Sequence, residues 1–243
     1  MPEYVRMMSG HLFDADVPWV YRGIANFDEH ALIAGSGRDH PHHRILTYNK
    51  RVKGGVEKRE RVALHEFELR SRPFLKERPD SMLELMFHAQ HHRLPTRLLD
   101  WSFSPLVALY FAVADYDRKN DGGVYAFRPP RSMYLADVPA AERKKIEDDP
   151  FSATQNYFTV PPYINGRIAA QQGCFTLHAV PQDIFSPVPA KIARIPAARK
   201  LDMWKELDAL GIKAETLFPD LEGVARSIMA QWYGPVGTLP NTV

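Results

Sequence analysis

A polar block between two apolar helical stretches constrains this chain more than any other feature of its sequence. The block covers residues 90–105 and reads QHHRLPTRLLDWSFSP. Upstream, apolar residues at helical spacing predict a helix that carries the amide of Gln90 on its apolar face. Downstream, Ser104 is expected to cap, and Pro105 to open, a helix over 106–114 that is apolar nearly all round. Charged side chains on the connector between these helices therefore need a partner or a ligand.

Three polar side chains, Thr96, Arg97 and Asp100, lie on this connector. Arg97 and Asp100 are close enough in sequence to form a buried ion pair that only fixes the helix junction. The same residues also suit a binding or catalytic site, because they supply a hydroxyl, a guanidinium and a carboxylate just before a buried helix. Both interpretations stay open at this point.

The composition sets wide limits on the fold and on the class of protein. A chain of 243 residues with 45% apolar residues can bury the core of one large domain, and no Gly/Ser-rich linker divides it. The net charge of +2 gives no strong basic field for nucleic acid. The single cysteine fits a reducing compartment. No apolar run reaches the about 18 residues of a membrane span, and the N-terminus has no secretory core, so we expect a cytoplasmic protein.

Hydrophobic patterns along the chain predict a mixture of helices and strands. Strands are expected at 19–24, 124–127, 157–160, 167–170, 174–180 and 191–196, and further helices at 59–72, 201–210 and 221–232. No repeat or low-complexity segment interrupts this order. We therefore expect one α+β domain over residues 1–243, with a curved β-sheet that is split by the helices of 60–116 and flanked by C-terminal helices.

Ten histidines raise the question of a metal site. His88 and His92 are one helical turn apart, but the residue after His88 is alanine, not the glutamate of a His-Glu-x-x-His zinc motif. The other group, His40, His42 and His43, offers no convincing set of ligands either. We expect no metal.

Motifs for nucleophilic catalysis and for phosphate loops are weak. Cys174 has the apolar surroundings of a small buried residue. No Gly-x-Ser-x-Gly turn surrounds Ser102. The Gly-Ser-Gly-Arg stretch over 35–38 lacks the lysine and the spacing of a P-loop, although Arg38 suits a phosphate as part of a basic patch.

Three separated elements carry the remaining functional signal. Arg22 ends an early strand between Tyr21 and Gly23, and its donors suit a bidentate contact with phosphate. Gly23 lacks a side chain and so permits close approach of a ligand. The stretch 96–102 adds hydroxyls and charges, and Trp101 or Tyr21 is available to stack on a base or a nicotinamide ring. The third element is a pair of glutamines at 171–172, before a late strand.

The chain resembles the FRG domain family. That family's pattern includes a Phe- or Tyr-Arg-Gly element, here residues 21–23, and a Gln-His-x-x-Leu-Pro-Thr-Arg-Leu-Leu-Asp-Trp core, here residues 90–101. The stretches 167–175 and 210–221 also look like parts of the family's pattern. The resemblance implies a single FRG-like domain with its core at about 15–230.

A second resemblance, to ADP-ribosyltransferases, implies a function. It places Arg22 on the pyrophosphate of NAD, Thr96 or Ser102 in the pocket, and Gln171 or Gln172 at the catalytic position. A glutamine hydrogen-bonds a ribose hydroxyl but takes no proton at neutral pH, so Asp100 or Glu66 is the candidate base.

From this resemblance we expect an enzyme that uses NAD as its substrate and either transfers ADP-ribose to a macromolecular acceptor or cleaves NAD. The alternatives are a non-catalytic module for nucleotides or nucleic acids, in which Arg22, Arg38 and Arg97 contact phosphates, and a metal-free nuclease or phosphotransfer enzyme. The residues expected to catalyse are Gln172, Gln171, Asp100 and Thr96. Those expected to bind the substrate are Tyr21, Arg22, Gly23, Arg38, Gln90, His91, Arg97, Trp101 and Ser102.

Overall fold

A six-stranded sheet forms the centre of the fold, and all of its neighbouring strands run antiparallel. The computed structural model describes residues 4, 18–28, 32–38, 55–75, 77–114, 119–162, 166–188 and 190–233. In spatial order the strands are β4 (Tyr157–Thr159), β5 (Gly173–Leu177), β2 (Leu98–Ser102), β1 (Val20–Ile24), β3 (Gly122–Phe127) and β6 (Ala190–Ile195). The sheet is open, and with its flanking helices it makes the α+β domain that the sequence predicted.

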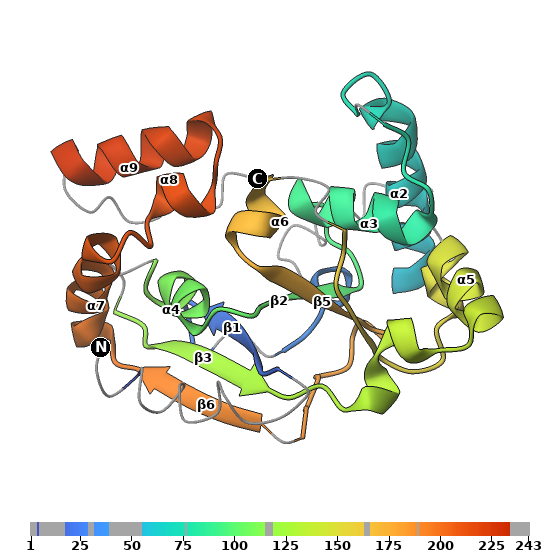
Figure 1. Cartoon of the computed structure of the whole chain (residues 1–243), viewed down its shortest axis with the longest axis horizontal. Helices are drawn as coiled ribbons and strands as arrows, with labels where there is room; N and C mark the ends of the chain where they lie inside the picture. Colours follow the sequence, from blue (N-terminus) through green and yellow to red (C-terminus); the bar gives the residue numbers. More distant parts are fainter. Residues whose placement is uncertain are drawn as a thin grey trace.

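Two groups of helices flank the sheet at opposite ends (Figure 1). One group contains α2 (Val56–Ser71), α3 (Met82–His91) and α5 (Ala140–Asp148). The other contains α7 (Ala197–Ala209), α8 (Ala214–Leu217) and α9 (Leu221–Tyr233). Between them, α4 (Pro105–Val113) packs on β1 and β3, and the short α6 (Gly166–Ala170) leads into β5.

The helix after the polar block forms as the sequence predicted. The hydroxyl of Ser104 accepts a hydrogen bond from the Val107 amide at 3.4 Å, and Pro105 occupies the first turn of α4. Nearly all of α4 is buried, because it lies across the centre of the sheet. A Cβ atom at Gly23 would lie 1.8 Å from the main-chain oxygen of Ala108, so the glycine brings α4 against β1. The missing side chain of Gly23 therefore makes room for α4, and the approach of a ligand to Gly23 stays a prediction.

One predicted strand is a helix in the structure. Residues 167–170 lie in α6, with Ile168 buried against the sheet. The stretch offers one β-branched residue beside two alanines, and alanine favours helices. The other predicted strands form, although β5 ends at Leu177 and not at residue 180. The connector of the polar block also forms a strand, β2, in the middle of the sheet.

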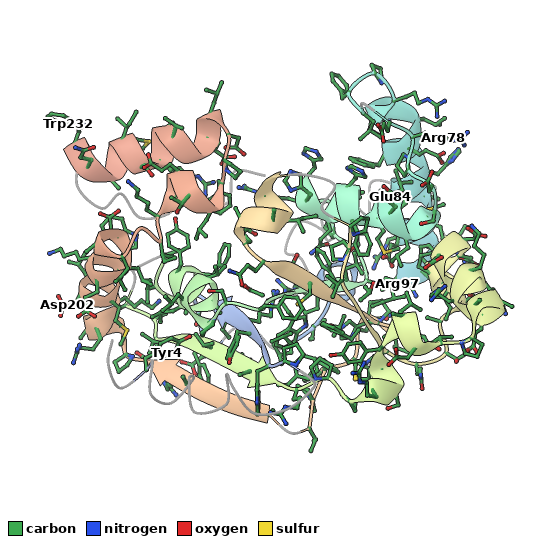
Figure 2. All side chains as sticks on the ribbon, in the orientation of Figure 1. Tyr4, Arg78, Glu84, Arg97, Asp202 and Trp232 are labelled. Carbon is green, nitrogen blue, oxygen red and sulfur yellow. The ribbon has the colours of Figure 1, made fainter. Side chains whose placement is uncertain are left out.

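Side chains fill the space between the sheet and its helices (Figure 2). Arg97 lies inside the molecule, whereas Trp232 projects from the outer end of α9. None of the helices that the structure describes combines the length and apolar character that a membrane crossing requires.

Candidate functional site

A cavity of about 330 Å³ opens beside β1 and β2, among α3, α4 and α6. This volume lies near the lower end of the range for small-molecule sites, about 300–1,000 Å³. Polar side chains dominate its lining on the β2 side, and apolar side chains of α4 close the other side. Its lining residues are Tyr21, Arg22, Gly23, Gln90, Arg93, Asp100, Trp101, Ser102, Val107, Ala108, Phe111, Arg167 and Gln171.

Asp100 presents its carboxylate to this cavity from the middle of β2. Oδ2 accepts hydrogen bonds from Nη1 of Arg22 at 3.4 Å and from Nε2 of Gln90 at 2.9 Å. Oδ1 has no partner among the described residues, and the side chain is 52% exposed. One carboxylate oxygen is thus fixed while the other is available to a ligand.

Arg22 holds the main chain as well as the carboxylate of Asp100. Its Nη1 donates to the main-chain oxygen of Asp100 at 2.7 Å. Strands β1 and β2 share one paired position, Tyr21 opposite Ser102, so this side chain supplies a hydrogen bond next to the end of the ladder. The guanidinium is 15% exposed, and its planar fork is oriented by Asp100 at the edge of the cavity.

Gln90 and Thr96 position Asp100 from the other side. Gln90 accepts a hydrogen bond from the hydroxyl of Thr96 at 2.7 Å, and this orients its Nε2 toward Asp100. Thr96 is fully buried and also accepts from the Leu98 amide. Thr96 therefore acts through Gln90, and it lies outside the cavity lining.

The late glutamines separate in space. Gln171 lines the cavity, and its Nε2 donates to the main-chain oxygen of Leu217 at 3.0 Å. Its main-chain oxygen accepts from the hydroxyl of Ser102, which ties α6 to the end of β2. Gln172 is exposed in the following turn, with φ of 48°, and does not line the cavity.

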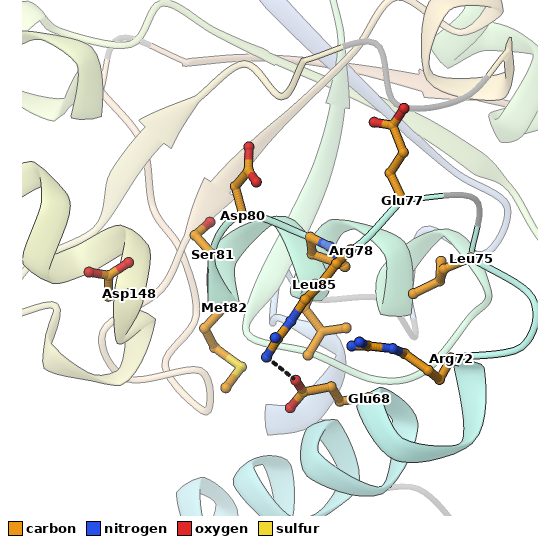
Figure 3. Close-up of a pocket in the computed structure, with 11 residues that line it drawn as sticks. Glu68, Arg72, Leu75, Glu77, Arg78, Asp80, Ser81, Met82, Leu85 and Asp148 are labelled. Atoms are coloured by element: carbon orange, nitrogen blue, oxygen red, sulfur yellow. Dashed lines mark ion pairs between the residues drawn. The ribbon is translucent and has the colours of Figure 1, made fainter.

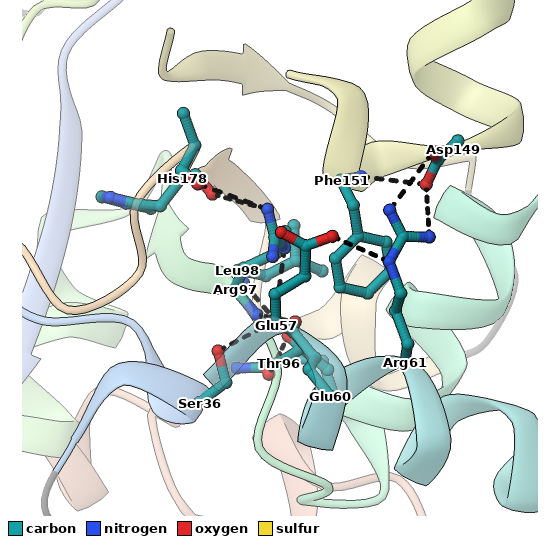
Figure 4. A network of polar contacts seen from close by, with 12 residues as sticks. Ser36, Glu57, Glu60, Arg61, Thr96, Arg97, Leu98, Asp149, Phe151 and His178 are labelled. Carbon is teal, nitrogen blue, oxygen red and sulfur yellow. Dashed lines mark hydrogen bonds and ion pairs between the residues drawn. The ribbon is translucent and has the colours of Figure 1, made fainter. Parts of the chain in front are cut away.

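The ion pair between Arg97 and Asp100, one of the two open interpretations of these residues, does not form. Arg97 is 1% exposed, and its Nε lies 3.3 Å from Oε2 of Glu60 on α2 (Figure 4). Glu60 also accepts from the hydroxyl of Ser36 and from the main-chain amide of Arg97. Burial raises the pKa of Glu60, against the opposing charge of Arg97 and these hydrogen bonds. Alternation along β2 places Asp100 on a different side from the guanidinium of Arg97, so neither reaches the other.

Two aromatic residues that were expected to stack on a ligand are buried. Trp101 is 3% exposed and donates from Nε1 to the hydroxyl of Thr176 at 3.0 Å, while its ring packs against Phe127. Tyr21 is 2% exposed under α4. Neither ring face is free, so the expectation of stacking on Trp101 or Tyr21 is wrong. Phe111 of α4 is the aromatic residue left at the cavity with partial exposure.

The remaining predicted residues, Arg38, His91 and Glu66, lie outside the cavity lining. Arg38 donates to the main-chain oxygen of Ile33, and burial, followed by the charge of Arg22, lowers its pKa to about 10. His91 precedes the cavity residue Arg93, and burial with the nearby charge of Arg167 lowers the pKa of His91 to about 4. Glu66 pairs with Arg70 on an exposed face of α2, away from the cavity lining.

Histidines of the described residues form no metal site. No group of three or more His, Cys, Asp or Glu side chains with the geometry of a metal site occurs in the part of the chain that the structure describes. The group His40, His42 and His43 lies outside those residues.

The sequence pattern of the FRG domain family matches residues 17–121. The chain contains an FRG domain. The matched range includes β1, β2, α3 and α4, and hence Arg22, Gln90 and Asp100 of the cavity. No curated protein and no solved structure matches the chain.

The cavity also takes residues from outside the matched FRG range. Arg167 comes from α6, and Gln171 comes from the turn that follows it. The sequence singled out neither Arg167 nor the cavity residue Arg93. Arg93 stands at a variable position of the FRG core pattern, and Arg167 begins the stretch that contains the two glutamines. Both arginines thus lie in segments that the sequence singled out, but nothing in the sequence distinguished them from their neighbours.

A second cavity, of about 490 Å³, lies at the far side of α3 (Figure 3). Its charged lining residues carry both signs, and Arg78 lies 3.7 Å from Glu68. None of the predicted site residues lines it.

Proposed function

We propose that the cavity binds NAD and that the protein cleaves the bond between nicotinamide and ribose, as an ADP-ribosyltransferase or NAD glycohydrolase. The observation that carries the proposal is the carboxylate of Asp100, with Oδ2 held by Arg22 and Gln90 and Oδ1 available to the cavity. A carboxylate fixed in this way can face a positive charge that develops during a reaction without first reorienting.

The reaction places such a charge on the ribose. The bond from C1′ to the nicotinamide nitrogen breaks, and its electron pair leaves with the nicotinamide, which becomes neutral. Positive charge then spreads over C1′ and the ring oxygen of the ribose, next to Oδ1 of Asp100. A hydroxyl, an amine or water forms the new bond to C1′ and loses a proton, for which Asp100 is the nearby acceptor.

Other cavity residues would orient the substrate. Arg22 suits the phosphate next to the ribose, because its guanidinium is already oriented at the edge of the cavity. Gln171 keeps Oε1 for a ribose hydroxyl, since its amide nitrogen is held by Leu217. Gln172 lies outside the cavity, so the proposal assigns the contact with ribose to Gln171. We propose that this cavity of about 330 Å³ takes the nicotinamide half of NAD and leaves the adenosine half outside.

A curved, split sheet of the ADP-ribosyltransferase kind belongs to this proposal. The single paired position between β1 and β2, with Arg22 beside it, supports a sheet that divides at this point. A cytoplasmic location and a macromolecular acceptor are further parts of the proposal.

Asp100→Asn tests the reaction separately from binding. We expect the release of nicotinamide to fall by about 100-fold or more, because the amide cannot balance the ribosyl charge, while the Kd for NAD changes by less than about threefold. Asp137→Asn is the matched control, since Asp137 forms an exposed pair with Arg131 away from the cavity. Calorimetry with NAD and an assay for free nicotinamide provide the measurements.

Two results would contradict the proposal. Equal turnover in Asp100→Asn and in the wild type would remove Asp100 from the reaction. A wild-type protein that neither binds millimolar NAD nor releases nicotinamide would exclude the NAD-cleaving function and leave a non-catalytic nucleotide-binding module as the better account.

A further inference from the structure

Arg93 has a backbone conformation that arginine rarely adopts. Its φ is 65°, in the left-handed region, immediately after the end of α3. The Arg93 amide bonds to the oxygen of Gln90, and the Leu94 amide bonds to that of Ala89, so the turn closes the helix. Glycine is the usual residue at such a position, because any Cβ atom makes this conformation unfavourable. The strain invites a search for a function of the arginine side chain.

The side chain of Arg93 lines the cavity and lies beside α9. Its Nη2 is 3.4 Å from Oε1 of Glu222, and the same oxygen bonds to Arg226. One carboxylate therefore serves two guanidinium groups. Arg93 is 52% exposed, so its pair with Glu222 contributes little to stability and leaves the guanidinium able to bind a ligand.

A second arginine, Arg167, lines the same cavity from α6. Its guanidinium lies over the ring of Phe218 at 4.6 Å and contacts the main-chain oxygen of His91 at 3.5 Å. No carboxylate among the described residues lies within ion-pair distance of it. Burial lowers the pKa of Arg167, and the charge of Arg93 lowers it further, against the partial support of Asp100 and Asp220. Arg93 and Arg167 thus line the same cavity, Arg93 shares the carboxylate of Glu222 with Arg226, and Arg167 has no carboxylate at ion-pair distance among the described residues.

We propose that Arg93 and Arg167 form an anion subsite of the cavity, distinct from the Arg22–Asp100 pair, and that this subsite binds a phosphate group of a diphosphate. The proposal deepens the proposed function, since NAD contains a diphosphate, but the subsite itself requires no NAD chemistry. A phosphate group between the two guanidiniums would supply the missing negative charge and accept charge-assisted hydrogen bonds from both.

Arg93→Gly tests the subsite with inorganic pyrophosphate as the probe. We expect the variant to bind pyrophosphate about tenfold or more weakly than the wild type, the usual effect of losing a charged hydrogen bond. Its Tm should stay the same or rise by about 2 °C, because glycine accepts the left-handed conformation without strain. Calorimetric titration and thermal unfolding of the full chain measure the two quantities.

Gln172→Gly is the matched control. Gln172 is the other described non-glycine residue with positive φ, at 48°, and it is exposed outside the cavity. This variant should relieve the same kind of strain and keep the affinity for pyrophosphate within about twofold of the wild type. If both glycine variants bind pyrophosphate more weakly than the wild type, the loss comes from the change in backbone conformation and not from the Arg93 side chain. That result would overturn the subsite.

Further outcomes separate the subsite from the NAD reaction. The subsite is overturned if Arg93→Gly binds pyrophosphate as tightly as the wild type does. It is also overturned if the wild type does not bind millimolar pyrophosphate, even if the protein cleaves NAD. Arg93-dependent binding of pyrophosphate by a protein that does not bind or cleave NAD supports the subsite and excludes the proposed function.

Discussion

Two arginine–carboxylate pairs arise from the same polar block, and their surroundings differ sharply. Arg97 and Glu60 are each 1% exposed in their side chains, with hydrogen bonds to Ser36 and to main-chain groups around them. Asp100 is 52% exposed at the cavity, and its partner Arg22 is 15% exposed. The comparison teaches that burial of both partners, and not the residue types, distinguishes a pair inside the fold from a pair that faces a cavity.

The buried pair joins segments that are distant in sequence. Glu60 brings α2 to the start of β2, and Nη1 of Arg97 contacts the main-chain oxygens of His178 and Ala179 after β5. The ring of Phe151 lies 4.1 Å from the guanidinium of Arg97 and 3.9 Å from that of Arg61 (Figure 4). Removal of one partner would leave the other charge buried without compensation.

Arg97→Met should produce the largest effect on stability. We expect the free energy of unfolding to fall by about 3 to 5 kcal/mol, because the carboxylate of Glu60 loses its buried counter-charge. Arg61→Met is the matched control: Arg61 lies against the same ring, but it is 44% exposed and should cost less than about 1 kcal/mol. Unfolding in urea measures both variants, and equal losses would contradict the distinction between the two arginines.

His178 lies near Arg22 and Arg97, and its imidazole should make the stability of the fold depend on pH. Burial, and then the charges of Arg22 and Arg97, lower the pKa of its imidazole to about 4 from an ordinary value of 6.5. The unfolded chain takes up this proton below about pH 6.5 while the folded protein does not, so stability falls as the pH drops from about 6.5 to about 4. The contribution is fully present above this window.

His178→Gln should make that fall in stability smaller by about 1 to 3 kcal/mol. Urea unfolding at pH 7 and at pH 4.5 provides the measurement, with His65→Gln, at an exposed position on α2, as the control. If stability depends on pH in the same way in His178→Gln and in the wild type, the folded protein does not hinder protonation of the His178 imidazole.

Asp100→Asn should have the smallest effect on stability. The amide keeps an oxygen for Arg22 and Gln90, and a half-exposed ion pair contributes at most about 1 kcal/mol. We therefore expect the urea midpoint to remain close to that of the wild type, in contrast to Arg97→Met. A loss as large as that of Arg97→Met would make the Arg22–Asp100 pair structural and remove the distinction between the two pairs.

Local signals in the sequence determined much of the fold. The cap at Ser104 and the proline after it set the start of α4, and β-branched together with aromatic residues predicted β1. These features depend on residues within a few positions of each other, so periodicity and capping reveal them. The FRG pattern includes Arg22, Gln90 and Asp100, which all line the cavity.

The tertiary structure alone decided the partners and the roles. Glu60 lies 37 positions from Arg97, and Arg22 lies 78 positions from Asp100, so only the packing of α2 and β1 against β2 could pair them. The same packing buried Trp101, moved Gln172 out of the cavity and brought Arg93 and Arg167 together. Pairing across such distances depends on how elements pack in three dimensions, and a local sequence pattern carries no information about it.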